Sequence, residues 1–249
     1  MIIIKNNQEI DLMRSAGKIV AETLLLVEEK VRPGITTAEL DRIAEEFITK
    51  HGARPSFKGL YGFPASLCIS VNEQVVHGIP GGYVLKDGDI ISVDCGAYKN
   101  GFHGDAARTF GVGNISEEAE KLINVTRESF FKGIEYAKVG NRLTDISHEI
   151  QSYVEASGFS VVRDFVGHGI GRVVHEDPDV PNYGRPGRGP KLVEGMALAI
   201  EPMVNVGNYK VKTLNDDWTV VTSDGSLSAH YENTIVILPD GPEILTLIK

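Results

Sequence analysis

Residues 90–111 read IISVDCGAYKNGFHGDAARTFG, and this stretch sets the expected fold. Its two strand-like runs, 90–98 and 102–111, are separated by the dipeptide Asn100-Gly101. Asparagine followed by glycine is the strongest short-range signal for a two-residue hairpin turn, because both positions tolerate a positive φ. The stretch therefore predicts an antiparallel β-hairpin.

The turn also determines which acidic residues of the hairpin lie together. With Lys99 opposite Phe102, counting outward places Asp105 opposite Gly96. Asp94 is two residues from Gly96, on the same face and diagonal to Asp105, about 7–8 Å apart at the backbone. Carboxylates that face each other on an apolar sheet are costly unless a cation lies between them. The hairpin predicts a shared ion, with an exposed face carrying scattered acids as the alternative.

The first strand of the hairpin has a counterpart in the second half of the chain. Gly88 leads into an apolar strand that reaches Asp94 six residues later. Gly195 leads in the same way to Glu201, 107 residues further on. A turn glycine, an apolar strand and a terminal carboxylate thus occur twice in the same order.

Helical patterns repeat at nearly the same offset. An amphipathic segment at 8–31 precedes a second helix at 34–52, and segments at 116–139 and 140–158 repeat this pair. Strands and helices that recur in one order indicate a duplicated unit with pseudo-twofold symmetry. We therefore expect an α+β fold with two related halves.

Length and composition favour one folded domain. The chain has 249 residues, of which 42% are hydrophobic and 24% are charged, as in an ordinary globular protein. No linker rich in serine or proline separates the halves. We expect a single catalytic domain over 1–249, with pseudo-repeats at about 1–112 and 113–249.

Charge and cysteine content exclude several classes of function. The formal net charge of -9 repels phosphate backbones, so nucleic acid is not an expected substrate. The two cysteines, Cys68 and Cys95, are too few for a disulfide scaffold or a thiolate zinc site. No apolar run is long enough for a signal peptide or a membrane span. We expect a cytoplasmic protein without a membrane partner.

Pseudo-symmetry brings further donors toward the two aspartates of the hairpin. Glu201 ends the repeated strand, and Glu232 lies on a strand predicted over 227–238. His168, in the stretch Gly-His-Gly-Ile-Gly, adds a nitrogen donor. Four carboxylates and one imidazole suit two first-row divalent ions such as Co, Mn, Fe or Zn. Paired ions can activate a water for attack on a carbonyl or phosphoryl centre, so these residues predict a dinuclear hydrolase.

The order of these five residues is similar to that of the methionine aminopeptidases. The motifs that carry the resemblance are VDCG at 93–96, GHGIG at 167–171 and EPM at 201–203. It covers essentially the whole chain, and the length indicates type I. The resemblance implies the pita-bread fold, in which two pseudo-twofold-related halves each contain antiparallel strands and two helices.

The resemblance also implies a role for each site residue. The implied metal ligands are Asp94, Asp105, His168, Glu201 and Glu232. Glu201 would also act as general base, His77 would contact the scissile amide, and His175 would support the oxyanion.

A pocket for the methionine side chain is implied as well. Its walls would be Phe63, Cys68 and Trp218, joined by the two catalytic histidines. Leu60 and Val174 stand where a tyrosine and a phenylalanine are common in that family, so the shape of the pocket departs from the pattern.

The implied activity is removal of the initiator methionine from polypeptides, with a small second residue preferred. It would require two divalent ions and a free N-terminal methionine on newly made polypeptides, with the ribosome as a candidate partner and a monomeric enzyme. The alternatives are an X-Pro aminopeptidase or dipeptidase of the same fold and a non-catalytic peptide-binding protein. Such binding proteins typically lose metal ligands, whereas all five positions are filled here.

Overall fold

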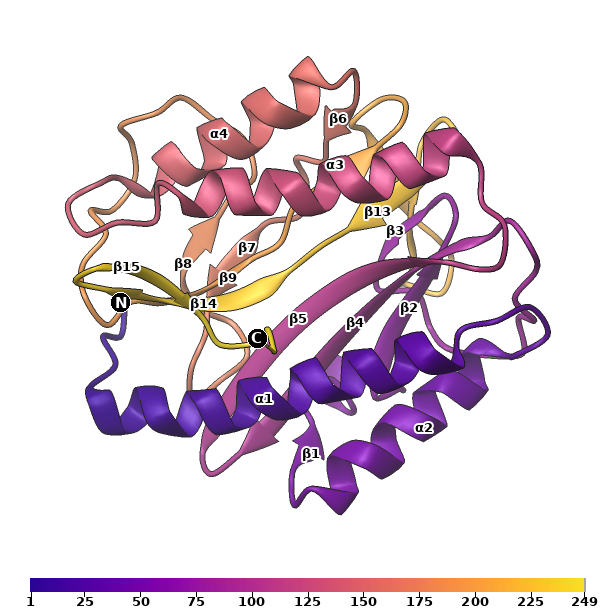
Figure 1. Ribbon diagram of the computed structural model, residues 1–249, viewed down its shortest axis with the longest axis horizontal. Coiled ribbons are helices and arrows are strands. Elements are labelled where there is room, and N and C mark those ends of the chain that lie inside the picture. Colours follow the sequence, from indigo (N-terminus) through magenta and orange to yellow (C-terminus); the bar gives the residue numbers. More distant parts are fainter. Residues whose placement is uncertain (249) are drawn as a thin grey trace.

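The computed structural model describes residues 1–248 and contains two similar halves (Figure 1). The helices of the N-terminal half are α1 (Asn7–Lys30), α2 (Thr37–Lys50) and the short 3-10 helix η1 (Leu60–Gly62). Its strands are β1 (Arg54–Pro55), β2 (Leu67–Val71), β3 (Gln74–Val76), β4 (Ile90–Lys99) and β5 (Phe102–Gly111). Lys249, the last residue of the predicted second repeat, lies outside the described residues.

The C-terminal half repeats the pair of helices and then adds shorter strands. Its helices are α3 (Glu117–Ile134) and α4 (Leu143–Ala156). Its strands are β6 (Ser160–Val161), β7 (Gly167–Gly169), β8 (Glu176–Val180), β9 (Ala197–Ile200), β10 (Met203–Asn205), β11 (Val211–Thr213), β12 (Val220–Thr222), β13 (Ser228–His230), β14 (Asn233–Leu238) and β15 (Gly241–Ile244). None of the helices within residues 1–248 is long and apolar enough to cross a membrane.

Antiparallel sheets occupy the middle of the molecule, between the two pairs of helices. One sheet has the order β1-β4-β2 with β5 paired to β4, and another has the order β15-β14-β9-β7-β8. Two smaller sheets have the orders β13-β10-β6 and β11-β12-β3. In Figure 1, α1 and α2 lie below the strands and α3 and α4 lie above them. The structure confirms the α+β class and the two helices in each half.

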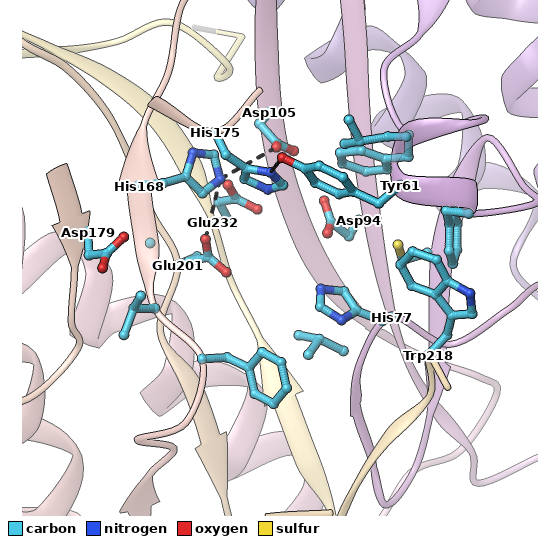
Figure 2. Close-up of a pocket in the computed structure, with 18 of the residues that line it drawn as sticks. Tyr61, His77, Asp94, Asp105, His168, His175, Asp179, Glu201, Trp218 and Glu232 are labelled. Atoms are coloured by element: carbon cyan, nitrogen blue, oxygen red, sulfur yellow. Dashed lines mark hydrogen bonds and ion pairs between the residues drawn. The ribbon is translucent and has the colours of Figure 1, made fainter. Parts of the chain in front are cut away.

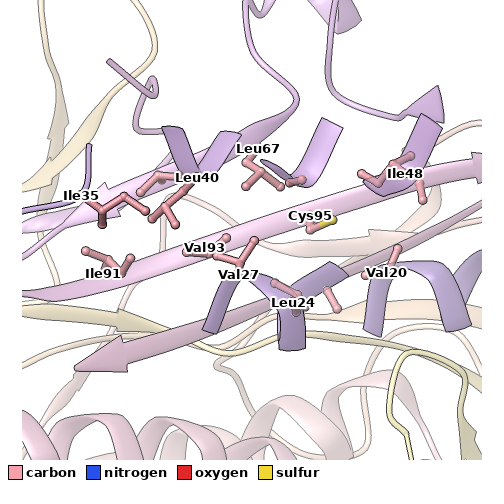
Figure 3. Packing of buried hydrophobic residues seen from close by; sticks show 14 of the residues in the cluster. Val20, Leu24, Val27, Ile35, Leu40, Ile48, Leu67, Ile91, Val93 and Cys95 are labelled. Atoms are coloured by element: carbon pink, nitrogen blue, oxygen red, sulfur yellow. The ribbon is translucent and has the colours of Figure 1, made fainter. Parts of the chain in front are cut away.

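The apolar cores of the two halves are built on the repeated strand. In β4, Ile91 and Val93 pack among residues of α1 and α2 (Figure 3). In β9, Leu198 and Ile200 pack among residues of α3 and α4 at the same offset of 107 positions. Because side chains alternate across a strand, the next residue in β4, Asp94, points away from its helices. The repeated strand has the same relation to its helices in both halves, and both carboxylate-bearing strand ends point toward the same region.

The β4–β5 hairpin has the predicted register. Lys99 lies opposite Phe102, and Gly96 lies opposite Asp105. Asn100 in the turn has a φ of 53°, and the glycine after it has a φ of 90°, as a two-residue turn with two left-handed positions requires.

Hydrogen bonds join β5 to residues 232–234 of the C-terminal half. The backbone N–H of Glu232 donates to the carbonyl of Ala107 at 3.0 Å, and the N–H of Ala107 donates in return at 3.3 Å. Thr234 Oγ1 accepts from the N–H of Asp105 at 3.0 Å and donates to its carbonyl at 2.9 Å. We call this set of contacts the seam. It holds the two halves of the molecule together beside Asp105.

The prediction of one continuous strand over 227–238 is wrong. β13 ends at His230 and β14 begins at Asn233, because β13 pairs with β10 whereas β14 pairs with β9 in another sheet. Glu232 lies in the break, where its backbone belongs to the seam. The helix expected to reach residue 139 is also shorter, since α3 ends at Ile134.

Two glycines allow α1 to pack closely on its neighbours, Gly104 on the β5 side and Gly17 on the side of Leu245. A Cβ added at Gly104 would lie 2.9 Å from the backbone N and Cα of Gly17 in α1. A Cβ at Gly17 would lie 2.4 Å from the carbonyl oxygen of Leu245. These distances are below any van der Waals contact, so the position of α1 over β5 depends on the missing side chains.

We predict that Gly104→Ala lowers the free energy of unfolding by about 1–3 kcal/mol, the usual cost of overpacking. The new methyl group must push α1 away from β5. Denaturant unfolding of the metal-free protein measures the change. Gly82→Ala is the control, because Gly82 is exposed and its added Cβ has no atom within 4 Å. Equal losses in the two variants would contradict the close packing.

Candidate active site

A cavity of about 520 Å³ receives lining residues from both halves of the chain (Figure 2). All five predicted metal ligands line it: Asp94 from β4, Asp105 from β5, His168 from β7, Glu201 directly after β9, and Glu232 from the seam. The structure therefore brings together, from five separate segments, the residues that the sequence placed together by the hairpin register and by pseudo-symmetry.

The donor atoms of these residues are close enough to share ions. One possible ligand atom each from Asp105, His168 and Glu232 lies within 4.8 Å of the others, and all three residues are buried. His168 Nε2 is 3.6 Å from Glu201 Oε1 and 4.0 Å from Asp105 Oδ2.

The carboxylates are electrostatically unfavourable as a group of bare anions. Burial raises the pKa of Asp94 to about 7. Burial, and then repulsion by Asp94 and Glu201, raises the pKa of Asp105 well above its usual range. The pKa values of Glu201 and Glu232 are raised for the same two reasons. Without a cation the protein must therefore retain protons at this centre or bear the repulsion.

The hydrogen bonds of His168 prepare it to bind a cation. Its Nδ1 donates to the carbonyl of Gly169 at 2.8 Å, so Nε2 carries the lone pair that faces the carboxylates. Burial lowers the pKa of His168 to about 4, which keeps the ring neutral at pH 7. A neutral imidazole held by a backbone carbonyl is the usual form of a histidine ligand. The flanking Gly167 is required because a Cβ there would lie 2.3 Å from the carbonyl oxygen of Ala199.

Several buried polar atoms of the centre have no hydrogen-bond partner among the described residues. They are the oxygens Asp94 Oδ1, Asp105 Oδ1 and Glu232 Oε1 and the nitrogen His230 Nε2. Buried polar atoms without partners are costly, and oxygen atoms that converge on one point are the ligands that hard divalent ions prefer. The donor set therefore fits divalent metal ions.

The structure also places both predicted catalytic histidines in the lining of the cavity. His77 directly follows β3 with a φ of 58°, and its ring lies edge-on to Phe165 at 5.5 Å. Burial lowers the pKa of His77 to about 4 and also lowers the pKa of His175. His175 lies edge-on to His168, with 4.6 Å between the ring centroids. Both rings are neutral near pH 7 and offer N–H donors beside the carboxylates.

One end of the cavity is apolar. Phe63 and Cys68 are buried there, and the ring of Trp218 meets that of Phe63 edge-on at 5.1 Å. Leu60 and Val174, the two departures from the resemblance, belong to the same apolar cluster. All the residues predicted to surround a methionine side chain therefore line one cavity or its apolar wall.

Three residues at this site were missed by the sequence analysis. Tyr61 and Phe165 line the cavity, and the buried His230 has its Nε2 3.8 Å from Glu201 Oε2 and 3.9 Å from Glu232 Oε2. Burial lowers the pKa of His230 to about 3. His230 could have been found from the sequence, because it lies two residues before the predicted ligand Glu232. Tyr61 lies between Gly59 and Gly62, and nearby glycines are only a weak signal of a functional residue.

Comparisons with known proteins agree with this geometry. The model of metallopeptidase family M24 matches residues 11–239. A methionine aminopeptidase of Clostridium perfringens is 81% identical over 249 residues, which are the whole of both chains. The chain belongs to the methionine aminopeptidases of family M24. Methionine aminopeptidase 1 of Bacillus subtilis is 59% identical over 248 residues, again covering 100% of both chains.

A solved structure of a methionine aminopeptidase has the same fold over the whole chain. The crystal structure of methionine aminopeptidase from Thermotoga maritima has a TM-score of 0.98 and 50% sequence identity, with 100% of both chains covered. The chain thus has the pita-bread fold implied by the resemblance. As a member of a metallopeptidase family it uses divalent metal, which agrees with the donor set described above.

We predict that Asp105→Asn stabilises the metal-free protein at pH 8 by about 1–3 kcal/mol. The raised pKa of Asp105 means that the folded state holds a proton that the unfolded state releases. Wild-type stability therefore falls as the pH rises above about 4, the range of an unfolded carboxyl group. Asparagine is neutral throughout, so its advantage should shrink toward pH 5.

Denaturant unfolding in chelator at pH 5 and pH 8 measures this effect. Asp240→Asn makes the same chemical change on the exposed surface and is the matched control. An Asp105→Asn variant that is less stable than wild type at both pH values would refute carboxylate repulsion as the dominant cost.

Proposed function

We propose that the protein removes the N-terminal methionine from polypeptides whose α-amino group is free, with preference for a small second residue. The observation that carries the proposal is the division of one cavity into an apolar end and a carboxylate-rich end, with His77 and His175 also in its lining. An unbranched thioether side chain suits the apolar wall, and a cationic amino group is attracted to the acidic end. The 81% identity to a methionine aminopeptidase supports this assignment.

We propose two divalent ions at the acidic end, and Co, Mn, Fe and Zn all suit the donors. They would be held by Asp94, Asp105, His168, Glu201 and Glu232. When bound, such ions supply an activated water and polarise the scissile carbonyl. On both aspartates a buried oxygen has no partner in the described part of the chain, which supports this ligand set.

We propose that Glu201 moves the proton that hydrolysis requires. It lies directly after β9 in the lining of the cavity, with Oε1 3.6 Å from His168 Nε2. A carboxylate within hydrogen-bond reach of the attacking water can act as general base. Glu201 accepts a proton from the attacking water and passes it to the leaving amine.

The two histidines donate hydrogen bonds during the reaction. His175 donates to the oxygen on which negative charge develops, and His77 donates to the scissile amide. Both rings are neutral, because their pKa values are lowered by burial, and a neutral imidazole still offers one N–H donor. Donors already in place for a developing oxyanion account for a large part of catalysis in acyl transfer.

The expected organisation and partners belong to the same proposal. The two pseudo-repeats act as one catalytic domain, because residues of both line the cavity. The substrates are nascent or newly made polypeptides in the cytoplasm, processed by a monomer, and the ribosome is a candidate partner. Nucleic acid and membrane are not part of the proposal.

A panel of three peptides tests the function. A Met-Ala peptide with a free amino group should release methionine, whereas the N-formyl form should react at least about 100-fold more slowly, because it lacks the amine and adds bulk at the acidic end. Ala-Pro-Ala should not be cleaved, since the methyl side chain of its N-terminal alanine is too small to fill the apolar end. Release of alanine from Ala-Pro-Ala, without release of methionine from Met-Ala, would favour the X-Pro peptidase instead.

We predict that His175→Ala lowers kcat by roughly 10²–10³, the usual loss of one oxyanion donor. The bond strengthens in the transition state, so KM should change much less than kcat. Bound metal should be unchanged, because His175 is not among the five proposed ligands. Measuring kcat, KM and metal content on one preparation checks all three. A loss of metal together with a rise in KM would show that the variant merely disorders the loop.

A further inference from the structure

The segment 59–62 at the rim of the cavity has an unusual backbone. Gly59 and Gly62 have φ angles of 86° and 92°, and Tyr61 between them has a φ of 51° and a ψ of 18°. A large side chain rarely adopts this left-handed conformation. The side chain of Tyr61 is also exposed, with a relative accessibility of 75%. A strained and exposed aromatic residue needs a reason to be there, and strain of this kind is concentrated at functional sites.

Tyr61 meets His175 across the cavity. The two rings are nearly parallel, with 9° between their planes and 5.7 Å between their centroids. The hydroxyl oxygen of Tyr61 is 3.3 Å from His175 Nδ1 (Figure 2). Tyr61 comes from the N-terminal half and His175 from the C-terminal half, and both line the cavity. The left-handed backbone thus directs the tyrosine toward the histidine of the other half.

This hydrogen bond has a chemical consequence for the imidazole. A tyrosine hydroxyl that donates to Nδ1 requires a lone pair on that nitrogen, so the single proton of a neutral ring lies on Nε2. Nε2–H is then available as a donor, whereas the opposite tautomer would present a lone pair to a developing negative charge. When the hydroxyl is the donor, as the proposal below requires, the contact selects the tautomer that can stabilise an oxyanion.

We propose that Tyr61 is a positioning residue that fixes the tautomer and orientation of His175. This inference rests on the proposed function of His175 as an oxyanion donor. Tyr61 itself does not touch the reacting atoms and acts through the imidazole. The residue adds a contact between the two halves at the cavity rim, in addition to the seam beneath.

The tautomer can be measured directly, without substrate or metal. In protein labelled with ¹⁵N-histidine, the ring nitrogen shifts of His175 distinguish a protonated Nε2 from a protonated Nδ1, and His175→Ala identifies the signals. We expect the Nε2–H tautomer in wild type and a mixture in Tyr61→Phe, which keeps the ring but loses the hydroxyl. An unchanged tautomer in Tyr61→Phe would overturn the proposal.

Kinetics then test whether the contact matters for the reaction. Tyr61→Phe should lower kcat for a Met-Ala peptide about three- to tenfold, the range for one neutral hydrogen bond, with little change in KM. Tyr61→Ala should lower kcat further, because the stacking is lost as well. In a His175→Ala background, Tyr61→Phe should have no additional effect, because there is no imidazole left to position.

Tyr83→Phe is the matched control, since it also removes a hydrogen-bonded hydroxyl but lies outside this cavity. Its kcat should equal that of wild type. The positioning role would be overturned if Tyr61→Phe lowered kcat in the His175→Ala background as much as it does in wild type. A change in KM alone would also overturn it. If wild type released no methionine at all, the proposed function would fail, while the tautomer measurement would still decide the contact between Tyr61 and His175.

Discussion

The seam between β5 and Glu232 is the constraint on which the site depends. Each half of the molecule has its own apolar core, and shared apolar clusters and the β12–β3 pairing also join the halves. At the acidic centre, the paired backbone bonds between Ala107 and Glu232, with the two bonds between Thr234 and Asp105, fix how the two halves meet. Because Asp105 and Glu232 take part through their backbones, their side chains are held beside each other. The same contacts that join the halves thus assemble the acidic centre.

This assembly has an electrostatic cost that the fold alone does not recover. All four carboxylates have raised pKa values, and three of these residues carry an oxygen without a hydrogen-bond partner within residues 1–248. A buried charge without a partner destabilises a protein, so this arrangement is explained by the cations it can bind. The carboxylates that can bind cations lower the stability of the metal-free protein, a trade-off that is common at functional sites.

The sequence predicted what is local and symmetric, and missed what depends on contacts between distant segments. Asn100-Gly101 fixed the hairpin register, and hence the diagonal placement of Asp94 and Asp105, because turn chemistry acts over a few residues. The break of the strand around Glu232 could not be seen, since it arises from two different sheets competing for neighbouring residues. Tyr61 was missed because a left-handed tyrosine has no propensity signal, and its contact with His175 joins segments far apart in the sequence.

The strand β4 shows why the core and the site of this fold cannot vary independently. Ile91 and Val93 face α1 and α2, whereas Asp94 lies on the opposite face and lines the cavity. In β9, Leu198 and Ile200 stand in the same relation to Glu201. A change in volume on the helix side of either strand must shift a backbone that carries a carboxylate on its other side, because interiors are packed too densely to absorb it locally. Core packing therefore sets the spacing of the acidic side chains, and through it the fit of the cations.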